Sequence, residues 1–80
     1  MEVNFELEDE YIPLDGLLKR CSLASSGAEA HLLVDDGKVK LNGKTESRRR
    51  AKVHPGDTVQ ACGHTIHISA SNSNRFDEIN

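Results

Sequence analysis

Hydrophobic and polar residues alternate at the start of the chain, and this pattern predicts a strand. Val3, Phe5 and Leu7 are each followed by a polar residue. A period of two places the three apolar side chains on one face of an extended segment. We therefore expect a half-buried strand whose polar face meets water.

The next segment changes to helical spacing. Pro13 is suited to the first turn of a helix, because its missing N–H would be unpaired there in any case. Apolar residues then recur at intervals of three and four, as expected for one buried stripe: Leu14, Leu17, Leu18 and Cys21.

A second helix is predicted to begin at Ser26. Ser26 and Glu29 have the spacing of a capping box, in which each side chain accepts a hydrogen bond from the other residue's backbone N–H. Gly37 is well placed to end this helix in a left-handed conformation. The buried stripe in between is predicted to consist of Ala30, Leu33 and Val34.

After Gly37 the period returns to two. Residues 38–41 alternate basic and apolar side chains and lead into Asn42-Gly43, a strong hairpin turn signal. A two-residue turn would place polar partners opposite Leu41 and Val39, so a longer loop also remains open. Residues 58–62 and 64–68 are two further strands around Gly63.

Together these elements predict an α+β fold in which two helices pack on a small, mostly antiparallel sheet. The pattern ends at residue 68, so we expect one domain over 1–68. Residues 69–80 are polar and without periodicity, and we expect them to form a disordered tail.

Composition excludes several classes of protein. The 80 residues suffice for one small core. The sequence has no apolar run of the ~18 residues that a membrane span needs, and its acidic first residues are unlike a signal peptide. Two cysteines cannot supply the disulfide framework of a small secreted domain. A single-domain cytoplasmic protein is therefore expected.

Charge is distributed unevenly along the chain. The formal net charge is −3, but residues 1–18 carry −6 and residues 19–52 carry +5. A local positive surface on an acidic protein favours one anion-binding face over general polyanion binding. The candidate contacts are the nine bases of the middle segment: Lys19, Arg20, Lys38, Lys40, Lys44, Arg48, Arg49, Arg50 and Lys52.

Other chemistry finds little support. Cys62, His64 and His67 are close in sequence, but no second ligand pair accompanies them, so no metal site is expected. No serine lies in a nucleophile-elbow pattern, and the adjacent Asp35 and Asp36 would not face each other on a helix. We expect no enzyme activity, no cofactor and no small-molecule substrate.

The order and spacing of the motifs resemble the S-four RNA-binding domain, also called the αL motif and named after the fourth protein of the small ribosomal subunit. The matching pieces span about 45 residues: Leu14-Asp15 with Leu17-Leu18, Ser26 with Ala30, Gly37-Lys38-Val39-Lys40-Leu41-Asn42-Gly43, and Gly56-Asp57-Thr58-Val59. The small size is similar to that of short stand-alone bacterial members. The resemblance implies binding of structured RNA, with ribosomal RNA or a ribosomal subunit as the expected partner of a monomer.

Two positions depart from the family pattern. Many members carry a base before Leu-Asp and an Arg after the Ser of the second helix, whereas this chain has Ile12-Pro13 and Gly27. The contacts are therefore expected from the basic stretch at 48–52, with Lys38 and Lys40 on the outer face of the hairpin. Aromatic residues are scarce, which favours recognition of RNA by shape and backbone.

Two other functions remain open at this stage. The chain could be a protein-interaction adaptor that keeps the fold without binding RNA, as the missing Arg after Ser26 would allow. A third, weaker possibility is a binder of small anions or nucleotides.

Overall fold

The computed structural model describes residues 1–71, which form seven strands and two helices. In chain order the elements are β1 (Glu2–Leu7), β2 (Ile12–Pro13), α1 (Leu14–Arg20), α2 (Gly27–Asp35), β3 (Val39–Leu41), β4 (Lys44–Thr45), β5 (Lys52–Val53), β6 (Thr58–Ala61) and β7 (His64–Ala70). No helix in this part of the chain is both long and apolar enough to cross a membrane.

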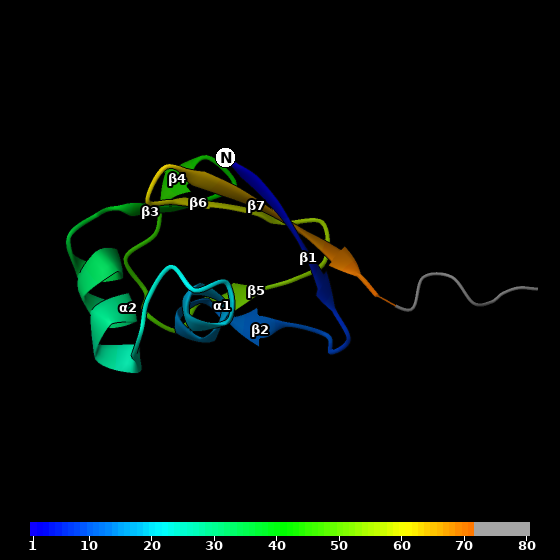
Figure 1. Cartoon of the computed structure of the whole chain (residues 1–80), viewed down its shortest axis with the longest axis horizontal. Coiled ribbons are helices and arrows are strands. Elements are labelled where there is room, and N and C mark those ends of the chain that lie inside the picture. Colours follow the sequence, from blue (N-terminus) through cyan, green and yellow to red (C-terminus); the bar gives the residue numbers. More distant parts are fainter. Residues whose placement is uncertain (72–80) are drawn as a thin grey trace, which may run out of the picture.

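Five of the strands form a mixed sheet in the order β1-β7-β6-β3-β4. The strand β1 runs parallel to β7, and every other neighbouring pair in this sheet is antiparallel. Both helices lie on the same side of the sheet, and its opposite face is open (Figure 1). The predicted α+β fold with a mostly antiparallel sheet is thereby confirmed.

The core lies between the helices and the inner face of the sheet. Leu14, Leu17 and Leu18 of α1 are fully buried, as the helical spacing predicted. They share one apolar cluster with strand residues such as Val59 and Ile66. Burying each such side chain stabilises the fold by about 1.5–3 kcal/mol.

The first hairpin adopts the shorter of the two turns that the sequence left open. Leu41 pairs with Lys44, so Asn42 and Gly43 alone form the turn, with φ of +53° and +85°. Positive φ at both positions gives the turn whose twist matches that of the strands. The polar partners are tolerated because β4 has only two residues, both exposed, at the edge of the sheet.

The ends of α2 follow local rules, with one difference from the prediction. Ser26 Oγ accepts a hydrogen bond from Glu29 N at 3.1 Å. The Glu29 carboxylate, however, accepts from Ser25 rather than from Ser26, so only half of the predicted capping box forms. At the other end Gly37 has φ +72°, and its N–H donates to Val34 O.

The strand β7 extends beyond the predicted end of the domain at residue 68. Ser69 and Ala70 pair with Glu6 and Leu7, and Ser71 N donates to Leu7 O at 3.1 Å. The strand predicted over 64–68 is therefore two residues longer in the structure. The rest of the predicted tail, 72–80, lies outside the described residues.

A second small sheet was not predicted, and it determines how α1 begins. Ile12 pairs with Val53 and Pro13 with Lys52. Pro13 lies just before α1 in an extended conformation and provides no side-chain cap. The first helical N–H groups donate instead to carbonyls of the loop between β4 and β5, as Leu14 N does to Ala51 O at 2.9 Å. We call residues 46–51 the arginine loop.

The carboxylate of Asp15 connects both helices to the arginine loop. Asp15 is 6% exposed, and its Oδ1 accepts from Gly16 N at 2.8 Å. Its Oδ2 lies 3.0 Å from His31 Nε2 of α2 and 3.2 Å from Arg50 Nη1. Burial by itself would raise the pKa of Asp15, but the hydrogen bonds with His31 and Gly16 and the charge of Arg50 outweigh it, so the pKa lies below its ordinary value.

Replacing Asp15 with Asn should destabilise the fold. One carboxylate oxygen that accepts hydrogen bonds would become an amide nitrogen, which cannot accept them from the same donors. We expect the free energy of unfolding to fall by roughly 1–3 kcal/mol, as measured by urea denaturation. Asp36→Asn is the matched control, since Asp36 is exposed at the end of α2, and it should change stability by less than about 0.5 kcal/mol. Equal effects of the two substitutions would contradict the structural role of Asp15.

The stabilisation by Asp15 should also depend on pH. Because its pKa is lower in the folded state than the ordinary 3.8, this stabilisation is complete above that value and is lost as pH falls through the folded pKa. The difference in unfolding free energy between wild type and Asp15→Asn should therefore shrink on acidification below 3.8. Urea denaturation over a pH series measures it, and a constant difference would disprove the linkage.

The left-handed position of Gly37 gives a third prediction. Gly37→Ala should lower the free energy of unfolding by about 1–2 kcal/mol, because an L-residue is strained at positive φ. The added Cβ would meet Thr45 Cγ2 only at 3.9 Å, so backbone strain is the sole cause. Gly27→Ala, in open space at the start of α2, should leave stability unchanged or raise it. Thermal unfolding of both variants distinguishes these outcomes.

Candidate nucleic-acid interface

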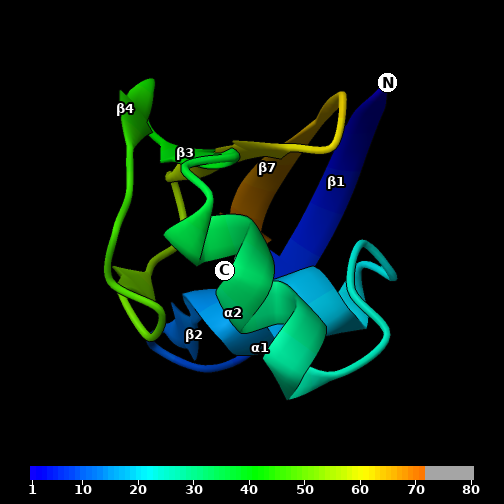
Figure 2. The ribbon, with the colours of Figure 1, turned by 90° about the vertical axis from the view of Figure 1, so that its left-hand side faces the viewer.

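The nine predicted contact residues lie on three separate parts of the molecule. Lys19 and Arg20 end α1, and three lysines belong to the first hairpin. The other four residues lie in the arginine loop and β5. Figure 2 shows this loop descending from β4 along one side of the molecule, while β3 lies above α2. The structure therefore does not gather all nine residues on one surface.

Two of the three consecutive arginines form exposed ion pairs with carboxylates of the same chain. Arg48 Nε lies 3.1 Å from Glu46 Oε2, and Arg49 Nη2 lies 2.6 Å from Asp35 Oδ2. The hydrogen bonds from Arg48 and from Arg49 hold the pKa values of Glu46 and Asp35 below their ordinary values. The sequence predicted these arginines as contacts for a ligand. In the structure the Arg48 ion pair lies within the arginine loop, whereas the Arg49 ion pair also binds the loop to α2.

The lysines differ from these arginines because they have no carboxylate partners. Within residues 1–71 none of the five lysines forms an ion pair. The ammonium group of Lys52 lies 5.0 Å from the centroid of the Tyr11 ring, a cation–π contact that leaves its charge uncompensated. Arg20 makes a similar contact, 5.6 Å from the centroid of the Phe5 ring.

One surface depression is lined by both arginine and lysine side chains. Arg48, Arg50, Ala51, Lys52 and His54 line it, and we call it the basic hollow. The arginine side chains there are 75% and 70% exposed. The guanidinium of Arg50 also donates a hydrogen bond to the buried Asp15, so this side of the hollow is held against the start of α1. Two guanidinium groups and an ammonium group around a concave surface are suited to phosphate oxygens.

Two residues at the basic hollow were missed by the sequence analysis: His54, which lines it, and Tyr11, which packs against His54. The ring of Tyr11 lies 6.1 Å from that of His54, centroid to centroid, and Tyr11 is 40% exposed. The pairing of β2 with β5 brings them together. Because each of these strands has only two residues, no periodicity in the sequence could have indicated their pairing.

Other predicted contacts lie elsewhere. Lys38 and Lys40 line a different depression, and the two depressions share no residue. No group of three or more potential metal ligands occurs among residues 1–71. Of the side chains considered for a metal, His67 Nε2 contacts Glu2 Oε1 at 3.0 Å, and Cys62 is a free, exposed thiol.

Comparison with known proteins agrees with the fold and the motifs. Residues 5–69 match the S4 domain family. The chain is 37% identical over 60 residues to the Escherichia coli (strain K12) protein "Putative RNA-binding protein YbcJ". The matched region covers 75% of this chain and 86% of the relative. The corresponding Shigella flexneri protein, "Uncharacterized protein YbcJ", matches equally well.

A solved structure supports the same assignment. The solution structure of Escherichia coli YbcJ, described as revealing an αL motif involved in RNA-binding, superimposes with a TM-score of 0.67 at 35% identity. The match covers 85% of this chain and 87% of that one. With its motifs in order, its two helices on a mixed sheet and the family match over 5–69, this chain belongs to the S4 domain family.

Proposed function

We propose that this protein binds structured RNA and that the basic hollow contacts the RNA backbone. The convergence of Arg48, Arg50 and Lys52 on one concave surface is the observation that carries the proposal. The similarity to YbcJ, whose description names an RNA-binding motif, supports it independently. On this proposal the chain is a binding module and not an enzyme.

The ion pairs of the arginines leave donors available for phosphate. A guanidinium group has five N–H donors. Arg48 contacts Glu46 through Nε and Nη2, so Nη1 remains available. Arg50 contacts Asp15 through Nη1 alone, so Nε and Nη2 remain available. Lys52 retains its full charge, so each of the three side chains can reach a phosphate without the loop being released.

The surroundings of the basic hollow favour RNA recognised by its backbone and shape. The ammonium group of Lys52 lies over the ring of Tyr11, 5.0 Å from its centroid. A base-stacking platform of the kind used by single-strand binders needs a free ring face. Folded RNA, which presents phosphates and 2′-hydroxyls in fixed positions, is therefore the expected partner. Ribosomal RNA is the first RNA to test, and a monomer is the expected binding state.

The remaining predicted contacts are proposed as secondary ones. They lie outside the basic hollow and would engage the RNA only if it extends past the loop: Lys19, Arg20, Lys38, Lys40, Lys44 and Arg49.

The double substitution Arg48→Gln/Lys52→Gln tests the proposal. We expect the affinity for a structured ribosomal RNA fragment to fall by about tenfold or more, since two phosphate contacts are lost. The slope of log affinity against log salt concentration should become shallower by about 0.7–0.9 per lost contact. Fluorescence anisotropy at several salt concentrations measures both quantities, and an unstructured oligonucleotide of equal length tests the preference for folded RNA.

Lys19→Gln/Lys44→Gln is the matched control for this experiment. It removes two positive charges that form no ion pair within residues 1–71 and do not line the basic hollow, so it should change affinity much less. Circular dichroism and urea denaturation establish that all variants are folded. If the wild type does not bind RNA, or if all variants lose affinity equally, the proposed interface is wrong, and a pull-down with the same variants would test the adaptor function instead.

A further inference from the structure

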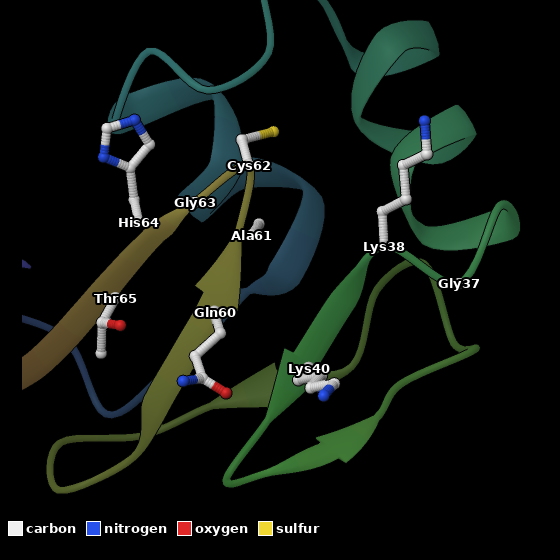
Figure 3. A pocket seen from close by; sticks show the side chains of 9 residues that line it. All are labelled: Gly37, Lys38, Lys40, Gln60, Ala61, Cys62, Gly63, His64 and Thr65. Carbon is white, nitrogen blue, oxygen red and sulfur yellow. The ribbon is translucent and has the colours of Figure 1, made fainter. Parts of the chain in front are cut away.

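A second depression lies where β3 and β6 meet, at the end of the sheet near the close of α2. Figure 3 shows it from the open face of the sheet, with the helices behind. The two backbone turns at Gly37 and Gly63 border it. We call it the sheet-edge hollow, and its side chains are those of Lys38, Lys40, Gln60, Cys62, His64 and Thr65.

Strand register places polar side chains in one row across this hollow. Lys40 pairs with Gln60, and Gln60 pairs with Thr65 on the next strand. Because side chains directly opposite in neighbouring strands point to the same face, an ammonium, an amide and a hydroxyl group lie side by side. Lys38 precedes β3, and Figure 3 shows its side chain extending toward α2, across from Cys62. All of these groups except the thiol are good hydrogen-bond donors.

The charge of the sheet-edge hollow is positive and uncompensated. No acidic residue lines it. Neither of its lysines forms an ion pair with any residue of 1–71. The nearest carboxylate in strand register is that of Glu2, which pairs across from Thr65 but contacts His67 Nε2 at 3.0 Å. The hollow therefore has two free ammonium groups and nothing of opposite charge inside it.

One lining residue has an unsatisfied polar atom. His64 Nδ1 is buried, and it finds no hydrogen-bond partner within residues 1–71. Buried polar atoms without partners are rare and costly, and each needs an explanation. Rotation of the imidazole about its Cβ–Cγ bond exchanges Nδ1 with Cδ2. A ligand that accepts a hydrogen bond would relieve the cost once the ring has turned and carries its proton on Nδ1.

From these observations we propose that the sheet-edge hollow binds a phosphate monoester. Lys38 and Lys40 would compensate the charge of the phosphate, while Gln60 and Thr65 would donate to its oxygens. The hollow is open to solvent, and its volume of about 610 Å³ is sufficient for a small phosphate compound. A terminal phosphate of an RNA strand and the phosphate of a free mononucleotide have this same chemistry. The proposal is independent of RNA binding at the basic hollow.

Titration of the full chain with adenosine 5′-monophosphate, followed by amide chemical shifts, tests the proposal. We expect saturable shifts confined to residues around Gly37, Gln60 and Gly63. Adenosine, which lacks the phosphate, should produce none, and inorganic phosphate should shift the same amides. No saturable shift with any phosphate probe, or equal shifts with adenosine, would overturn the proposal.

Two double variants separate a built site from general attraction to lysines. Lys38→Gln/Lys40→Gln should weaken binding of adenosine 5′-monophosphate by at least about tenfold, equivalent to 1.4 kcal/mol. Lys19→Gln/Lys44→Gln removes the same charge outside the hollow and should leave the dissociation constant nearly unchanged. If both double variants weaken binding equally, the nucleotide is attracted by net charge alone, and the proposed site is wrong.

A pair of RNA hairpins identifies the source of the phosphate. One hairpin carries a 5′-phosphate and its twin a 5′-hydroxyl. If only the phosphorylated hairpin shifts the amides of the sheet-edge hollow, the ligand is a strand end. If neither hairpin does so while adenosine 5′-monophosphate still saturates the site, the ligand is a free nucleotide. If neither the hairpins nor the nucleotide shift these amides, the site is rejected, whether or not RNA binds at the basic hollow.

Discussion

The fold depends on the way in which the buried carboxylate of Asp15 is compensated. An ionised group with so little exposure to water needs partners, and here they come from three segments: the backbone of α1, His31 of α2 and Arg50 of the arginine loop. Apolar packing alone would let two short helices slide on a small sheet. Three directional contacts to one carboxylate define a single arrangement of both helices and of the loop that begins α1.

The same contacts connect stability to the proposed interface. Arg50 contributes to the interior and to the basic hollow at once, and Arg49 ties the loop to α2 through Asp35. A ligand phosphate near these groups competes with carboxylates that are already bound, so part of its attraction is cancelled. The lysines face no such competition, which makes them the more effective source of electrostatic affinity, while the arginines keep the loop in place.

Features encoded by neighbouring residues could be predicted, whereas those that depend on distant contacts could not. The Ser26 cap, the left-handed Gly37 and the Asn42-Gly43 turn are local, and the structure has all three. Periodicity and turn signals indicated the order of the main elements, and the family resemblance implied the function. The parallel pairing of β1 with β7 had no local signal. Within the candidate site, counting charges located the basic residues but could not reveal Asp15 and Asp35, the carboxylates that Arg50 and Arg49 contact from far along the chain.

The pairing of β1 with β7 also sets an order for folding. Residues 2–7 pair with residues 65–70, so β1 finds its partner only after β7 has been synthesised. Until then β1 has an unpaired backbone edge and apolar side chains that become buried only in the folded sheet, features that favour association with other chains. Closing so long a loop makes folding slower than for a protein of local contacts. The helices and the two hairpins can form early, but the sheet becomes complete only after residues 65–70 have been synthesised.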